Sequence, residues 1–145
     1  MTASPRAGTL TFAIAACLAG AAAASYAAGG HEPKTVTGNV VDAACFMIHP
    51  QAADAASHKE CGTACMSRGV PLAIAGDDGA LYFAADANQR LSAFHGQHVR
   101  ATGDVTEKKE PMELKMPVGD KNTMTVKVEG GYKVIALETL AKAAK

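Results

Sequence analysis

The sequence has no excess of charge of either sign, because 14 basic residues balance 14 acidic ones over 145 residues. A nucleic-acid-binding domain of this size would carry a basic surface, so nucleic acid is not an expected partner. The chain is too short for separate cofactor and substrate domains. It also lacks a phosphate-binding glycine loop and any motif of an activated nucleophile. These absences favour a single small domain and argue against an enzyme.

The N-terminal segment has the three-part layout of a secretory signal peptide. Arg6 is the only charged side chain before an apolar stretch over 9–24, and the small residues Ser25 and Ala27 lie three and one positions before a cleavage site after Ala27. The apolar stretch is too short and too rich in alanine for a typical membrane span. We therefore expect 1–27 to be a signal peptide and the mature protein to be periplasmic or secreted.

A membrane anchor is the alternative fate of this segment. Residues 14–17, Ile-Ala-Ala-Cys, resemble the box at which bacterial lipoproteins are acylated. The residues after Cys17 are apolar, whereas lipoproteins usually turn polar there. We expect membrane attachment only if Cys17 carries a lipid.

The mature chain contains an odd number of cysteines, namely Cys45, Cys61 and Cys65. One of them cannot pair within the chain, and a domain of this length does not need a dense disulfide framework. In an oxidising compartment an odd cysteine indicates a metal, a partner or redox chemistry. The chain lacks C-x-x-C and C-x-x-C-H, which disfavours a thioredoxin-like protein and a c-type haem protein.

Alternating apolar residues predict a mainly β fold with short helices. The predicted strands, of which 71–86 forms a hairpin around an Asp-Gly turn, are 34–42, 71–86, 98–105, 124–128 and 132–137. Asp86 can cap a short helix that Gly96 ends, and residues 107–110 are expected to form a solvated loop.

Glycines inside two of these strands, Gly38 and Gly103, indicate the tight bends of a small barrel. The segments around them, 36–40 and 99–105, resemble those of small bacterial OB-fold proteins. The resemblance implies a small OB-like five-stranded barrel, with three strands, a helix and two more strands.

The predicted domain boundaries follow from this order of elements. We expect a flexible lead-in at 28–33, an OB-like barrel domain over 34–140 and a tail at 141–145. After its first strand the chain inserts a helical Cys/His segment at 43–69, which contains every cysteine of the mature chain.

The insertion has the spacing of a metal site, D-x-x-C-x-x-x-H followed by H-x-x-C-x-x-x-C. A helix that starts at His58 and stops at Gly69 would place a histidine and two cysteines on one face. A cysteine at the end of the preceding strand would complete a Cys₃His set, which is typical of structural zinc. The predicted ligands are Cys45, His58, Cys61 and Cys65. Further ligands or supporting groups are His49, Asp42, Met47 and Met66.

Copper is the other ion that this segment suits. Cys61-Gly-Thr-Ala-Cys65 with a nearby histidine resembles the copper sites of periplasmic copper chaperones and of the binuclear centre in respiratory oxidases. Thiolate, imidazole and thioether ligands together select Cu(I). Three more methionines, Met112, Met116 and Met124, are interpreted either as core filling or as a second copper-binding patch.

The order V-x-G-x-V-x-D-x-x-C, then H-x-x-C-x-x-x-C, then G-x-P is met by 36–45, 58–65 and 69–71. It resembles a group of small exported bacterial OB-like proteins of uncharacterised function. The resemblance implies a dedicated Cys/His site but no activity. We predict an exported, non-catalytic protein that holds one metal ion, either structural zinc or copper for handling or electron transfer. Its partner is left open, with a periplasmic protein as one candidate.

Two alternatives stay open. The first is a binding module without metal, in which Cys45 forms a disulfide with Cys61 or Cys65. The second is a protein that uses haem or thiol redox chemistry. An enzyme would need an open coordination position that carries water.

Overall fold

The structure is a computed structural model that describes residues 32–50, 56–86 and 89–144, with side chains from Gly62 onward in the helix at 56–67. The expected signal peptide, Cys17 and most of the expected lead-in lie outside the described residues, as do the side chains of His58 and Cys61. The chain divides into the units Met1–Gly30 and His31–Lys145, of which the second is described below. Within the described part, none of the helices has the length and apolar character of a membrane span.

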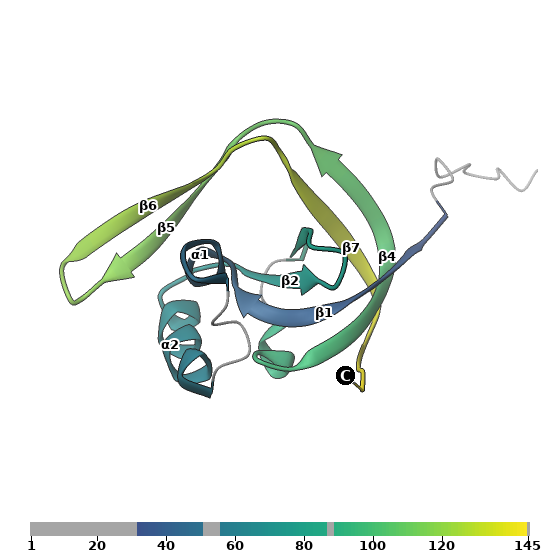
Figure 1. Cartoon of the computed structure of the whole chain (residues 1–145), viewed down its shortest axis with the longest axis horizontal. Helices are drawn as coiled ribbons and strands as arrows, with labels where there is room; N and C mark the ends of the chain where they lie inside the picture. Colours follow the sequence, from purple (N-terminus) through teal and green to yellow (C-terminus); the bar gives the residue numbers. More distant parts are fainter. Residues whose placement is uncertain (1–31, 51–55, 87–88, 145) are drawn as a thin grey trace, which may run out of the picture. The chain divides into compact units, whose positions relative to one another are not determined.

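Five strands close into a barrel in the order β1-β2-β3-β7-β4 (Figure 1). They are β1 (Lys34–Asp42), β2 (Leu72–Gly76), β3 (Leu81–Ala84), β4 (His98–Lys108) and β7 (Tyr132–Lys142). Strands β3 and β7 are parallel, and all other neighbours are antiparallel. This is the strand order of an OB barrel. The predicted OB-like fold with a helical insertion after its first strand is confirmed.

The barrel core follows the period-two pattern of the strands. Val36 and Val40 of β1 point inward, and Gly38 between them lies against β2. The buried side chains that fill the interior are Val36, Val40, Leu72, Ile74, Tyr82, Leu91, Val99, Ala101 and Ile135. Strand β7 runs on to Lys142, into the segment that was expected to be a tail.

Two glycines permit the bends that close the barrel. A Cβ at Gly38 would overlap the carbonyl of Ala75, and a Cβ at Gly103 would overlap the carbonyl of Ala136. The β4–β7 pairing also shifts register between Thr102 and Gly103. The interpretation of these glycines as sites of tight bending is therefore confirmed.

The expected arrangement between β4 and β7 is wrong. Residues 107–110 were expected as a loop, with the strand at 124–128 continuing into the main sheet. Instead β4 extends to Lys108, and β5 (Met112–Val118) pairs with β6 (Asn122–Val128) in a separate two-stranded sheet. Charged residues such as Glu113 and Lys115 alternate with the apolar ones in β5 and lie on its exposed face, so the strand resembles a charged loop in sequence.

The helices also differ from expectation in their bounds. Helix α1 (Ala43–Ile48) was not expected, and α2 (Ala56–Ser67) starts two residues before His58. The end of α2 is confirmed, because Gly69 follows it with φ of 86°. The expected helix before β4 contains one 3₁₀ turn, η2 (Ser92–Phe94), in its described part.

Replacement of Gly38 by alanine tests the closure of the barrel. The added Cβ meets backbone of β2 rather than a flexible side chain, so the strands must separate. We expect Gly38→Ala to lower the free energy of unfolding by about 3 kcal/mol, measured by denaturant unfolding. The control Thr35→Ala, on the exposed part of the same strand, should change it by less than about 0.5 kcal/mol. Equal stabilities of the two variants would contradict this account of the bend.

Candidate metal centre

Asp42, Cys45 and Cys65 come together where β1, α1 and α2 meet. A carboxylate oxygen of Asp42 and the two Sγ atoms all lie within 4.8 Å of one another. The three residues are 4%, 8% and 7% exposed, respectively. A buried group of one carboxylate and two thiols at this separation can hold a metal ion, because all three are ligands of thiophilic metals.

The D-x-x-C spacing is the spacing of a helix cap. Asp42 ends β1 with extended backbone, and its Oδ1 accepts hydrogen bonds from the N–H groups of Ala44 (3.0 Å) and Cys45 (3.1 Å). Ala43 N–H donates to the carbonyl of Pro71, which joins the start of α1 to the chain just before β2. The cap therefore starts α1 and places Cys45 in its first turn, beside the carboxylate.

The second carboxylate oxygen of Asp42 is left without a hydrogen-bond partner. Within the described part of the chain Oδ2 is buried and unpaired, whereas Oδ1 accepts both cap bonds. Buried carboxylates are normally paired, because burying an unpaired charge is costly. Oδ2 belongs to the same carboxyl group that lies within 4.8 Å of both thiols, so a cation bound there would satisfy it.

The C-terminal turn of α2 delivers the second thiol. The carbonyl of Cys65 accepts hydrogen bonds from the N–H groups of Arg68 and Val70, and Gly69 takes the positive φ that this turn requires. Val70 is fully buried and lies in the same apolar cluster as both cysteines. The chain reversal after α2 thus anchors Cys65 in the interior.

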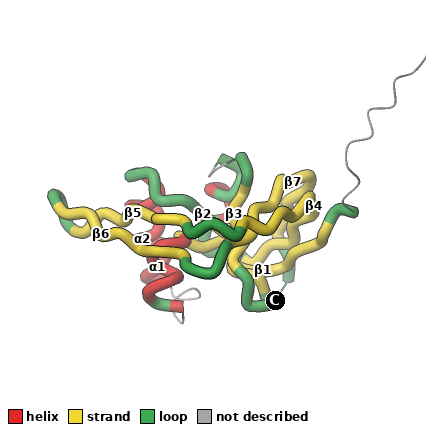
Figure 2. The backbone as a smooth tube through the Cα atoms, turned by 90° about the horizontal axis from the view of Figure 1, so that it is seen from above, coloured by secondary structure: helices red, strands yellow, loops and turns green. Residues whose placement is uncertain are grey.

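Strand β5 of the β5–β6 hairpin lies beside α1 (Figure 2), and the hairpin residues Leu114 and Val128 belong to the same apolar cluster as both cysteines. Met116 of β5 brings its Sδ to 3.7 Å from Cys45 Sγ, and the Arg68 guanidinium donates to the carbonyl of Gly119 at the hairpin turn. The apolar cluster comprises Ala43, Ala44, Cys45, Cys65, Val70, Ala73, Phe83, Leu114 and Val128. The site therefore lies between two insertions of the barrel, one helical and one a hairpin.

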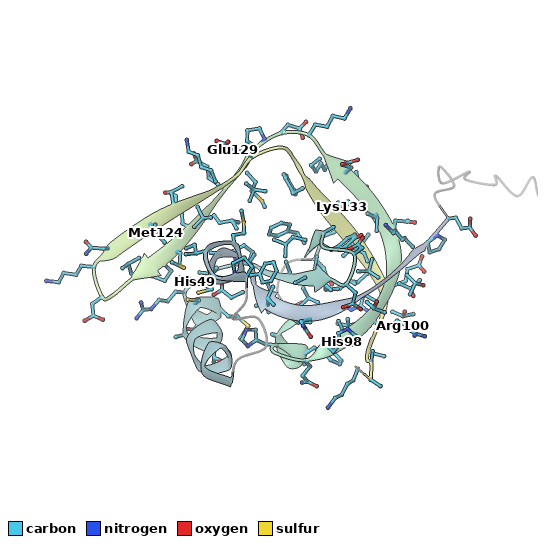
Figure 3. All side chains as sticks on the ribbon, viewed as in Figure 1. His49, His98, Arg100, Met124, Glu129 and Lys133 are labelled. Atoms are coloured by element: carbon cyan, nitrogen blue, oxygen red, sulfur yellow. The ribbon has the colours of Figure 1, made fainter. Side chains whose placement is uncertain are left out.

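The remaining predicted ligands are not members of this group, and they lie in different parts of the structure or outside its described part. His49 is exposed at the end of α1 and donates its backbone N–H to the Cys45 carbonyl (Figure 3), and it is not a member of the group. Met47 packs against the cysteine cluster, whereas Met66 packs against the barrel core. Cys61 precedes Cys65 by one turn of α2, and His58 precedes Cys61 by three residues; their side chains lie outside the described residues.

The structure shows no disulfide between Cys45 and Cys65, although their sulfur atoms are close. A bond from Cys45 to Cys61, the other pairing considered, involves a side chain outside the described residues.

The sequence reasoning missed two features that position the site. Met116 was grouped with Met112 and Met124, because nothing in the spacing shows that β5 folds back over Cys45. His95 is buried, and its ring lies where a Cβ on Gly62 would be. A glycine inside a helix is unfavourable by about 1 kcal/mol relative to alanine. Gly62, in C-G-T-A-C, could therefore have indicated from the sequence that another side chain approaches the helix closely there.

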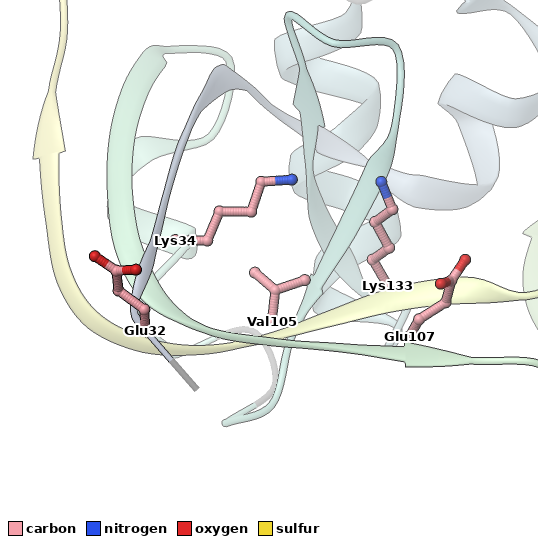
Figure 4. A pocket seen from close by; sticks show the side chains of 5 residues that line it. All are labelled: Glu32, Lys34, Val105, Glu107 and Lys133. Carbon is pink, nitrogen blue, oxygen red and sulfur yellow. The ribbon is translucent and has the colours of Figure 1, made fainter. Parts of the chain in front are cut away.

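A hollow of about 380 Å³ is lined by Glu32 and by residues of β1, β4 and β7 (Figure 4). Lys34 and Lys133 line it, and their Nζ atoms lie 5.6 and 5.2 Å from the ring centre of Tyr82. The Tyr82 hydroxyl donates to Asp78, which lowers the pKa of that carboxyl, while burial raises the pKa of Tyr82. None of the described residues that line this hollow is a cysteine.

No family model, curated protein or solved structure matches the chain. The resemblance to exported OB-like proteins therefore stays a prediction, and the site is interpreted from its own geometry.

Two substitutions of Asp42 distinguish its role as a helix cap from the effect of its buried charge. In metal-free protein Asp42→Ala removes the cap of α1 and should lower the free energy of unfolding by about 1 kcal/mol. Asp42→Asn keeps a capping oxygen and removes the buried charge, so it should be at least as stable as the wild type. Denaturant unfolding in chelator measures both. Equal losses in the two variants would show that the charge itself, and not the cap, stabilises the metal-free fold.

Proposed function

We propose that this protein is an exported, non-catalytic metal-binding protein that holds one Cu(I) ion between Cys45, Cys65 and Met116. The observation that carries the proposal is the pair of buried thiols of Cys45 and Cys65, which lie close together, with Met116 Sδ 3.7 Å from Cys45 Sγ. Metal handling is the function that such a site supports best.

The donor set favours copper. Two thiols and a thioether are soft ligands, and this combination selects Cu(I) over hard cations. Zinc makes no comparable use of a thioether, so in a zinc site the approach of Met116 to Cys45 would serve only to fill the core.

Burial favours storage or transfer of the ion over catalysis. All three members of the Asp42, Cys45 and Cys65 group are at least nine-tenths buried. A catalytic metal needs an open position for water and substrate. In an oxidising compartment a bound ion would also protect the two thiolates from oxidation.

Zinc is the second candidate, and the observation that favours it is the unpaired Oδ2 of Asp42. A carboxylate oxygen with two thiolates makes three ligands of a tetrahedral site, and α2 carries Cys61 and His58 within two turns of Cys65. The two candidates therefore differ in one ligand, which is the Met116 thioether for Cu(I) and the Asp42 carboxylate for zinc.

Titration of the reduced protein in the absence of oxygen tests the proposal. We expect about one equivalent of Cu(I) to be retained against a competing chelator, with the affinity falling as the pH falls because each thiol must release its proton. Met116→Leu should weaken Cu(I) binding about tenfold and leave zinc binding unchanged. Cys65→Ser should abolish retention of Cu(I), with circular dichroism confirming that the variant is folded.

Met112→Leu is the matched control, because Met112 lies on the same face of β5 and packs against the same apolar cluster, whereas the sulfur that lies 3.7 Å from Cys45 Sγ is that of Met116. Its Cu(I) affinity should equal that of the wild type. Tight zinc binding that depends on Asp42 but not on Met116 would establish the second candidate. Isolation of the protein without metal and with one free thiol would instead establish the disulfide-containing binding module.

A further inference from the structure

We propose that Met124 and Met116 form a methionine path along which Cu(I) passes between solvent and Cys45. The inference rests on the proposed function, since such a path serves only a site that holds a soft ion. It assigns to Met124 the first contact with an incoming ion, supplied by a soft donor such as a thiol or thioether complex of Cu(I).

The strand register puts the two methionines on one face. Met116 of β5 and Met124 of β6 are direct partners in the hairpin, so their side chains project to the same side with Cβ atoms about 5 Å apart. Met116 Sδ lies 3.7 Å from Cys45 Sγ. Neighbouring thioethers on a two-stranded ribbon therefore lead to the buried thiol.

Exposure increases along the same face. Leu114 is 3% exposed, Met116 is half-buried, and Met124 is 39% exposed. Val118, beyond them, is 44% exposed. Core filling accounts for a buried methionine but gives no reason for a solvent-exposed one directly opposite Met116.

Ligand strength gives the path a direction. A thioether is a neutral, weak ligand that holds Cu(I) briefly, whereas a thiolate binds it more strongly. The ion can move from Met124 to Met116 and then to Cys45 by exchange of ligands. Copper stays in the Cu(I) state throughout, and the thiol proton leaves to solvent when the copper–thiolate bond forms.

Stopped-flow loading tests the path. Reduced full-length protein is mixed with a coloured Cu(I) chelate without oxygen, and loss of the chelate absorbance gives the rate. Met124→Leu nearly conserves volume and removes only the exposed sulfur. We expect it to slow loading about tenfold while equilibrium affinity stays within about twofold, because Met124 touches the ion only in transit.

Val118→Leu is the matched control, since it alters an exposed apolar residue on the same face without changing any sulfur. It should load at the wild-type rate. Met124→Leu loading at the wild-type rate, with full stoichiometry, would overturn the path while leaving the proposed function intact. Failure of the wild type to take up Cu(I) would overturn both.

Discussion

The site depends on one buried carboxyl group with two different oxygens. Asp42 Oδ1 accepts the N–H groups of Ala44 and Cys45 in the first turn of α1 and so starts a helix at the end of a barrel strand, while Oδ2 is buried without a partner among the described residues. Removing a carboxylate from water is costly unless each oxygen is compensated. The cap compensates one oxygen, and a metal ion between Cys45 and Cys65 would compensate the other. One residue thus links the start of the insertion to the chemistry of the site.

The barrel contributes rigidity, and the two insertions carry the proposed ligands. The closed sheet fixes the ends of β1, β2 and β4, and from these ends α1, α2 and the β5–β6 hairpin project to one side. The apolar cluster around Cys45 joins all three of these elements to β2 and β3. A site on the barrel itself would have to be built on the exposed faces of short strands. A site between insertions can be buried and still have a route to solvent along one of them.

Most of the barrel could be predicted from the sequence, because period-two alternation and glycines inside strands are local properties. The hairpin was missed because its charged face conceals the alternation, and α1 was missed because six residues give too short a pattern. Cys45, Cys65 and Asp42 were identified by spacing. The contact of Met116 with Cys45 joins residues 71 positions apart, so no spacing rule could reveal it. The contact between Met116 and Cys45 therefore results from long-range packing and not from a local sequence motif.

X-ray absorption at the copper edge of the loaded, full-length protein tests the central claim most directly. Three sulfur neighbours around a single Cu(I) ion, falling to two when leucine replaces Met116, are the predicted result. A coordination sphere made of nitrogen and oxygen alone would contradict it. Such a result would place the ion on histidines or carboxylates elsewhere and leave the buried thiols without a role in metal binding.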